Sequence, residues 1–184
     1  MENRSLTMSA TLVSELERLA NTLTGEQAPE TEVPLAAIGE KIAGCLGVKT
    51  DEVAILGVSR RWKHLHFLMP LALKNMGSIP LSSTSALAAR TVRDNRAEIN
   101  NTFVGARHAS VFEGVKAETI SGEAIQKIIS APISNGGRVV GVMQVSRKGS
   151  TPATAGADFT AAELRQVLAL CRPLGRLVEH LAGE

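Results

Sequence analysis

The sequence predicts an α+β domain in which helices flank a mainly antiparallel sheet. Apolar residues recur at spacings of three and four near both ends of the chain, which is typical of amphipathic helices. Between these ends the period changes, and the runs SAPIS and RVVGVMQVS are joined by Asn135-Gly136-Gly137, the clearest hairpin signal in the chain. Hairpins imply antiparallel pairing, because parallel strands need long crossover connections, and the helices then cover the sheet.

The expected elements follow in order along the chain. A first helix covers about 5–23, a polar connector follows, and a second helix ends at Gly47. Their apolar stripes are Leu12, Leu16, Leu19 and Leu23 in the first helix, and Leu35, Ile38, Ile42 and Leu46 in the second. We expect strands at 53–58, 64–69 and 78–81, and a helix over 85–95 that the hydroxyl groups of 82–85 cap.

The second half of the chain contains an irregular segment, the hairpin and a long helix. Residues 99–115 show no period, with a helical turn expected near 108–113. Pro132 cannot donate a ladder hydrogen bond, so it marks a bulge or an edge-facing position. The last helix begins at Thr160, and its heptad-like seam is Leu164, Val167, Cys171, Leu174, Val178 and Leu181.

Length and composition narrow the class of protein. The 184 residues suffice for one domain with a sizeable core, which we divide into an N-terminal helix and connector (1–30) and a domain (31–184) that includes the C-terminal helix. A net charge of +2 and 3% aromatic residues argue against nucleic-acid binding. Because no run of eighteen apolar residues and no signal-peptide core occur, we expect no membrane span and a cytoplasmic protein.

Two stretches resemble the GAF domain family. Residues 130–171, SAPISNGGRVVGVMQVSRKGSTPATAGADFTAAELRQVLALC, show the family's strand, glycine turn, second strand, loop and DFT helix start. Residues 77–92, GSIPLSSTSALAARTV, are similar to its third strand and the helix after it. The resemblance spans about 31–181 and implies a GAF-like antiparallel sheet flanked by helices, with the N- and C-terminal helices packed together. GAF domains bind cyclic nucleotides, haem, bilins, amino acids or nothing known, and fold does not determine function.

The resemblance also implies a structural clamp around the loop that follows the hairpin. Cyclic-nucleotide-binding members carry Asn-Lys, a variable loop, Phe, three residues and Asp-Glu; Lys148 and Phe159 match, and Glu163 stands at the Asp position. Arg147 and Leu164 depart from the pattern, which argues against cyclic-nucleotide binding. We predict that Lys148 pairs with Glu163 across the loop and that the pair holds the loop in place.

The family's pocket position implies a ligand-binding set. Its expected members are Trp62, His66, Ser83, Arg93, His108, Phe112 and Ser130. A haem or metal site built from His66 and His108 competes with the simpler interpretation of a solvated sheet face and a loop histidine, which we prefer. The arginines at 90, 93 and 96 suit an anionic ligand if their helix borders the pocket, and otherwise form a solvated helix face. We predict no metal, and the cofactor is unknown.

The sequence favours a binding domain over an enzyme. Cys45 and Cys171 lie on apolar helical stripes, where buried thiols are usually inert, and no catalytic constellation is present. We therefore expect a small-molecule-binding sensory or regulatory domain, with the ligand beneath 108–113 and signalling through a separate protein, since no output domain occurs. We also expect a homodimer through the terminal helices. The alternative is a homodimeric interaction scaffold with a degenerate pocket; a GAF-fold enzyme such as a methionine sulfoxide reductase comes third.

Overall fold

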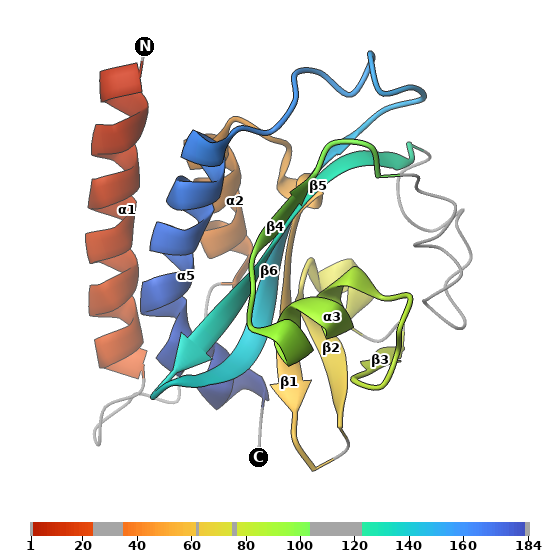
Figure 1. Ribbon diagram of the computed structural model, residues 1–184. Coiled ribbons are helices and arrows are strands. Elements are labelled where there is room, and N and C mark those ends of the chain that lie inside the picture. Colours follow the sequence, from red (N-terminus) through yellow and green to blue (C-terminus); the bar gives the residue numbers. More distant parts are fainter. Residues whose placement is uncertain (1, 24–34, 62, 75–76, 104–122, 183–184) are drawn as a thin grey trace.

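The computed structural model describes residues 2–23, 35–61, 63–74, 77–103 and 123–182, with backbone alone for 2–9 and 23. Six strands form one antiparallel sheet in the order β3-β2-β1-β6-β5-β4. The strands are β1 (Val53–Ser59), β2 (His64–Met69), β3 (Ser78–Pro80), β4 (Glu98–Asn100), β5 (Ile125–Asn135) and β6 (Arg138–Lys148). Figure 1 shows that described helices cover both faces of this sheet.

Each helix packs through its apolar stripe on one face of the sheet. On one face lie α1 (Glu2–Leu23), α2 (Leu35–Leu46) and α5 (Ala161–Ala182), and on the other lies α3 (Leu87–Asp94) (Figure 1). Two short 3-10 turns, η1 (Thr50–Glu52) and η2 (Leu71–Leu73), flank the β1–β2 hairpin. The expected α+β architecture is confirmed, and no helix in the described part of the chain combines the length and apolarity that a bilayer crossing requires.

The hairpin of β5 and β6 forms where its sequence predicts. Gly136 and Gly137 have φ values of 54° and 78°, a left-handed pair that only glycine adopts without strain. The register shifts between Ile133 and Ser134, one residue beyond Pro132, and β4 pairs with β5 only as far as Ser130. Pro132 therefore lies close to a bulge and beyond the last β4 partner, the kind of position in which a residue without an N–H is tolerated.

The strand β4 corrects the prediction of an irregular segment beginning at residue 99. It contains three residues, Glu98–Asn100, and covers the outer edge of β5. Three residues are too few to show an alternation of apolar and polar side chains, so a strand of this length leaves no period in the sequence.

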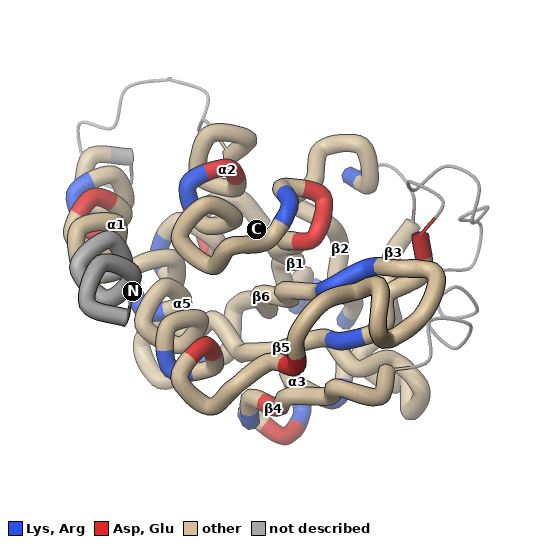
Figure 2. Tube along the Cα trace, turned by 90° about the horizontal axis from the view of Figure 1, so that it is seen from above, with Lys and Arg blue, Asp and Glu red and all other residues tan. Residues whose placement is uncertain are grey.

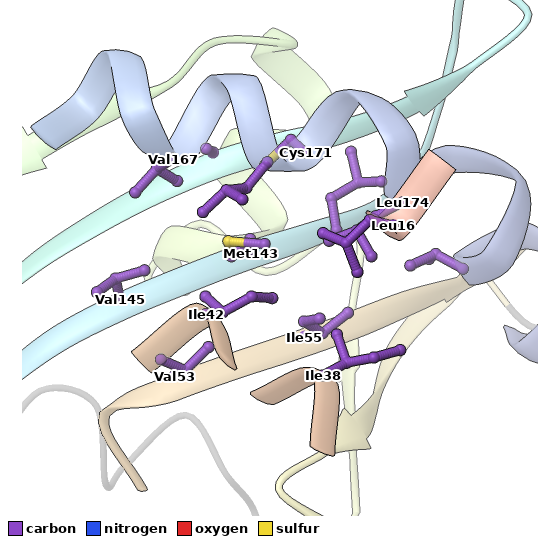
Figure 3. Close-up of a cluster of buried hydrophobic side chains, with 14 of the residues drawn as sticks. Leu16, Ile38, Ile42, Val53, Ile55, Met143, Val145, Val167, Cys171 and Leu174 are labelled. Atoms are coloured by element: carbon purple, nitrogen blue, oxygen red, sulfur yellow. The ribbon is translucent and has the colours of Figure 1, made fainter. Parts of the chain in front are cut away.

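The main core fills the space between the sheet and the three helices. Figure 3 shows Ile38 and Ile42 from α2 and Val167, Cys171 and Leu174 from α5, which meet the sheet residues Val53, Ile55, Met143 and Val145. A second cluster lies under α3, where Leu56, Leu65, Phe67 and Val142 meet Ala88 and Ala89. Because both faces of the sheet are covered by apolar layers, the sequences of β1 and β6 are almost continuously apolar.

The terminal helices pack against each other within one chain, as expected. Leu12, Leu16 and Ala20 of α1 are buried against α5 and α2. The last helix has apolar side chains on two sides, and these are used by the sheet and by α1. Gly175 lets α5 approach the sheet closely, because a Cβ at this position would overlap the backbone carbonyl oxygen of Ser134.

Candidate functional site

The α3-side face of the sheet changes from apolar to polar along the strands. Across β1, β6 and β5, the residues Leu56, Val142 and Pro132 form one apolar row. The next row consists of Ala54, Gln144, Ser130 and Glu98, and it crosses β1, β6, β5 and β4. We call these four residues the polar row, since all except Ala54 are polar. Side chains of paired residues in adjacent antiparallel strands share a face, so the polar row lies beside the apolar layer that α3 covers.

Three buried polar side chains of this region form a hydrogen-bonded chain. Thr91 Oγ1 of α3 lies 2.7 Å from Ser130 Oγ, and the amide nitrogen of Gln144 donates to Ser130 Oγ at 3.3 Å. Thr91 Oγ1 also donates to the Leu87 carbonyl at 2.9 Å. The exposed fractions are 2% for Thr91, 0% for Ser130 and 6% for Gln144. Burial of polar groups costs free energy unless hydrogen bonds compensate it, so this buried cluster beside an apolar row is the leading candidate site.

Sequence reasoning placed Ser130 in its expected ligand-binding set and did not include Gln144 or Thr91. A signal for Gln144 exists, because it is the one strongly polar side chain inside the run VVGVMQV. Strand alternation places Gln144 on the same face as Val142, so a polar group on a buried face could have been inferred. Thr91 gives no such signal, since a threonine in a short helix can also bond the carbonyl four residues earlier and face solvent.

The arginines near this face are engaged in structural contacts. Arg90 forms an ion pair with Glu98 at 2.6 Å, which ties α3 to β4. The guanidinium of Arg93 donates to the backbone carbonyls of Leu81 and Ser83 at 2.7 and 2.5 Å and so holds the segment between β3 and α3. Arg93, expected to line the site, therefore makes its described hydrogen bonds to backbone on the protein's surface.

Ser83, another expected lining residue, organises the start of α3. Its hydroxyl accepts a hydrogen bond from the Ala86 N–H at 3.2 Å and lies 3.4 Å from Ser85 Oγ. This contact satisfies the N–H of Ala86, which is the N-cap residue of α3. Ala86 itself makes no side-chain cap hydrogen bond, so the hydroxyl cap predicted from 82–85 does not form. Trp62, His108 and Phe112, the other expected residues, lie outside the described part of the chain.

His66 lies on the opposite face of the sheet from Ser130, so these two residues cannot line one cavity as predicted. It pairs with Gly57, whose missing side chain is approached by Ala182 of α5, whereas its neighbours Leu65 and Phe67 point to the α3 side. The error arises because a strand places adjacent residues on alternate faces and the sequence left the choice of face open. Burial, together with the nearby charges of His64 and Lys74, lowers the pKa of His66 below 6.5.

The loop after β6 is held by Arg147. Its guanidinium lies 2.6 Å from Glu163 Oε1, donates to the Ala157 carbonyl at 2.6 Å and stacks 4.2 Å from the centre of the Phe159 ring. Glu163 Oε2 accepts from the N–H and hydroxyl of Thr160 at 2.8 and 2.9 Å, which completes a capping box at the start of α5. We call Arg147, Phe159 and Glu163 the loop clamp.

The predicted ion pair between Lys148 and Glu163 is wrong. Lys148 Nζ lies 2.8 Å from Asp51 Oδ2 and donates to the Asp51 carbonyl at 2.7 Å. Successive residues of a strand point to opposite faces, so Lys148 faces away from α5 when Arg147 faces toward it. The residue at the position of the family's Asn therefore makes the contact that the resemblance implied for the Lys.

A second set of contacts fixes the same loop from β5. Lys127, directly opposite Arg147 in the register, lies 2.8 Å from Asp158 Oδ1 and donates to the Gly156 carbonyl at 2.5 Å. Asn101 exchanges hydrogen bonds of 2.9 and 3.0 Å with the backbone of Phe159. Viewed from this end, basic and acidic positions lie near each other around β5 and β6 (Figure 2). The two opposed cations are thus each balanced by a carboxylate, and the loop has a defined path.

Neither thiol lies in an environment that favours nucleophilic chemistry. Cys45 and Cys171 are buried in α2 and α5, and burial raises the pKa of Cys171 to about 12. Reactive cysteines need thiolate character and access to solvent. The described part of the chain also contains no group of three or more His, Cys, Asp or Glu side chains that could hold a metal ion.

A hollow lies at the C-terminal end of α5, away from the polar row. Its lining consists of Val58, Arg60, Val140, Glu179 and Ala182. The carboxylate of Glu179 is bonded to Asn135 and Arg138, at 2.5 and 3.0 Å. It joins the β5–β6 turn to α5, which is a structural role.

Comparison with known proteins supports the fold. No protein-family model matches the sequence, and no curated protein is significantly similar to it. Solved structures do match. The GAF domain of an Acinetobacter phosphoenolpyruvate-protein phosphotransferase is 17% identical, with a TM-score of 0.64 over 98% of this chain and 95% of that one. The GAF domain of the corresponding Coxiella burnetii protein gives 13% identity and a TM-score of 0.60 over 98% and 93%.

An enzyme structure is also similar. The free methionine-R-sulfoxide reductase of Neisseria meningitidis is 15% identical, with a TM-score of 0.56 over 95% of this chain and 89% of that one. GAF domains and an enzyme thus share this architecture. At these identities the likeness establishes a GAF-like fold, and function has to be argued from the side chains.

Proposed function

We propose that this chain, which has the fold of a GAF domain, is a sensory or regulatory domain that binds a small molecule against the polar row. The observation that carries the proposal is the buried cluster of Thr91, Ser130 and Gln144. A domain whose sheet served packing alone would place apolar side chains here, as it does one row away at Leu56 and Val142. Binding sites combine apolar walls with a few placed polar groups, and this face has that combination.

The neighbours of Gln144 support a site at this position. Its direct cross-strand neighbours are Ala54 on β1 and Ser130 on β5, and Ser146 follows on the same face of β6. These side chains are small, so they leave the Gln144 amide as the longest polar group projecting from this part of β6. The loop clamp and the Lys148–Asp51 contact hold the end of β6, so the amide is presented from a rigid strand.

We also propose that the domain acts through a partner and assembles as a homodimer. For regulation, the ligand-bound and empty states must differ in affinity for that partner. The helix α1 lies on the outside of α5, farthest from the sheet, and is therefore placed to contact another molecule (Figure 1). Because Leu12, Leu16 and Ala20 are buried within the chain, a dimer through α1 would use its other sides.

We propose a non-enzymatic role. A reductase of the thiol type needs an accessible cysteine, and Cys45 and Cys171 are both buried. The raised pKa of Cys171 removes its nucleophilic thiolate at neutral pH. The similarity to a sulfoxide reductase is therefore interpreted as shared architecture.

Native mass spectrometry tests the binding proposal. The protein is incubated with a small-molecule extract of its expression host, desalted, and measured before and after denaturation. We expect a non-covalent adduct that unfolding releases and that the variant Ser130→Val loses, while Ser134→Ala on the exposed part of β5 keeps it. The same spectrum reports the dimer mass. A protein without an adduct and without a thermal shift in the extract would contradict the proposal and favour the interaction scaffold.

A further inference from the structure

We propose that the ligand is uncharged where it meets β6 and presents a hydrogen-bond donor next to an acceptor, as a carboxamide, a lactam or the edge of a nucleobase does. This inference deepens the proposed function and rests on it. It follows from the hydrogen-bond directions in the cluster of Thr91, Ser130 and Gln144, from the engagement of the surrounding charges and from the shape of the sheet face.

The hydrogen-bond directions are determined by donor counting. Thr91 has a single hydroxyl hydrogen, which it donates to the Leu87 carbonyl at 2.9 Å. At the 2.7 Å contact Ser130 must therefore donate to Thr91 Oγ1. With its one hydrogen used, Ser130 can only accept from the Gln144 amide, which agrees with the nitrogen of Gln144 lying 3.3 Å away. The chain runs in one direction, from Gln144 to Ser130, Thr91 and Leu87.

Gln144 is consequently left with two unused functions on one planar group. Its amide oxygen and its second N–H make no hydrogen bond with any described residue, although Gln144 is buried, with an exposed fraction of 6%. A buried amide that lacks partners costs free energy, and a ligand that supplies both partners removes this cost. A glutamine amide pairs in a bidentate manner with an adjacent donor and acceptor, as it does with the edge of adenine.

Three cations around this face, all in the described part of the chain, are already engaged. Arg90 is paired with Glu98, Arg93 with backbone carbonyls, and Lys148 with Asp51. A carboxylate or phosphate placed against Gln144 would find none of these cations available without breaking such a contact. An anion buried without a counter-charge is strongly disfavoured, so a neutral group is preferred at this position.

The sheet surface beside Gln144 suits a flat apolar body. Ala54, which is only partly buried, flanks it on β1, and Leu56 and Val142 beyond it are already covered by α3. A planar ring with an amide-type edge would place its edge on Gln144 and its ring over Ala54, the partly buried neighbour on β1. Nicotinamide and 2-pyridone have this chemistry, whereas nicotinate has the same ring as nicotinamide with a carboxylate in place of the amide.

The test measures binding of these three probes by saturation-transfer NMR and calorimetry at millimolar concentration. The proteins compared are the wild type, Gln144→Leu, Gln144→Glu and the control Gln126→Leu. Gln126 lies elsewhere on β5, and its amide donates to the Gly149 carbonyl in the wild type. We expect the neutral probes to bind and nicotinate to bind at least about fivefold more weakly. Losing one bidentate pair should weaken the neutral probes about fivefold to hundredfold in Gln144→Leu and leave Gln126→Leu unchanged.

The outcomes separate this inference from the proposed function. Thermal unfolding of each variant comes first, and Gln144→Glu, which keeps the side-chain shape, replaces Gln144→Leu if the latter is unfolded. If nicotinate binds as well as nicotinamide, or Gln144 variants bind the neutral probes normally, the inference is overturned and the site remains. If no neutral probe binds but an extract yields an adduct, the inference also falls. If neither probes nor extract bind, the proposed function falls with it.

Discussion

Replacing Arg147 by Met and Glu163 by Gln, singly and together, isolates the ion pair of the loop clamp. Methionine retains an apolar stem that can pack over the Phe159 ring, while it removes the guanidinium that lies 2.6 Å from Glu163. Glutamine can still accept from Thr160 in the capping box, so the change at Glu163 removes mainly the charge. The double-mutant cycle then reports the coupling between these two side chains alone.

The size of the coupling follows from burial. The side chains of Arg147 and Glu163 retain 16% and 21% of their exposure. Exposed pairs couple by roughly 0.2–1 kcal/mol, and breaking a fully buried pair costs about 3–5 kcal/mol. A pair that is mostly buried yet reached by solvent should couple by about 1–2 kcal/mol, which in a domain of this size corresponds to about 2–8 °C in Tm.

Urea unfolding followed by circular dichroism measures the four free energies of unfolding. A parallel cycle with Lys148→Met and Glu163→Gln is the control, since Lys148 is paired with Asp51 and its effect should add to that of Glu163 within about 0.5 kcal/mol. The coupling of Arg147 and Glu163 should also survive moderate salt, because partly buried pairs are screened less. The reasoning is refuted if Lys148 couples to Glu163 and Arg147 does not.

Three further predictions concern other parts of the molecule. Gly175→Ala should destabilise the protein by about 1–3 kcal/mol, because the new methyl group meets the Ser134 carbonyl. Gly44→Ala, on the exposed side of α2, should stabilise it by up to about 1 kcal/mol, because alanine has the higher helix propensity. Urea unfolding of both variants measures the two effects. Native protein should not react with a thiol reagent at pH 8 until it unfolds, since the pKa of Cys171 is about 12, and rapid labelling without unfolding would contradict this. The pKa of His66 is lowered in the folded state, so on acidification the unfolded chain binds a proton at His66 before the folded chain does. The free energy of unfolding should therefore fall as the pH drops below about 6.5 and level off below the folded pKa. Unfolding curves at several pH values should show a smaller slope for His66→Gln.

The sequence alone was sufficient for features that depend on nearby residues. The stripe of Leu12 and Leu16, the seam that ends at Leu181 and the glycine turn of the hairpin each arise from spacings within a few residues, and each formed as predicted. The α+β class follows from the order of these elements. The capping box of Thr160 and Glu163 is equally local, because both partners lie within one helical turn.

Tertiary structure decided which side of the sheet each polar residue faces and which residue it meets there. His66 and Ser130 lie on opposite faces, Arg147 in place of Lys148 reaches Glu163, and Gln144 joins Thr91 through Ser130. A one-residue shift of register moves every side chain of a strand to the other face. The register and the side taken by α3 and α5 are set by apolar burial summed over the whole sheet, so no short stretch of this sequence contains that information.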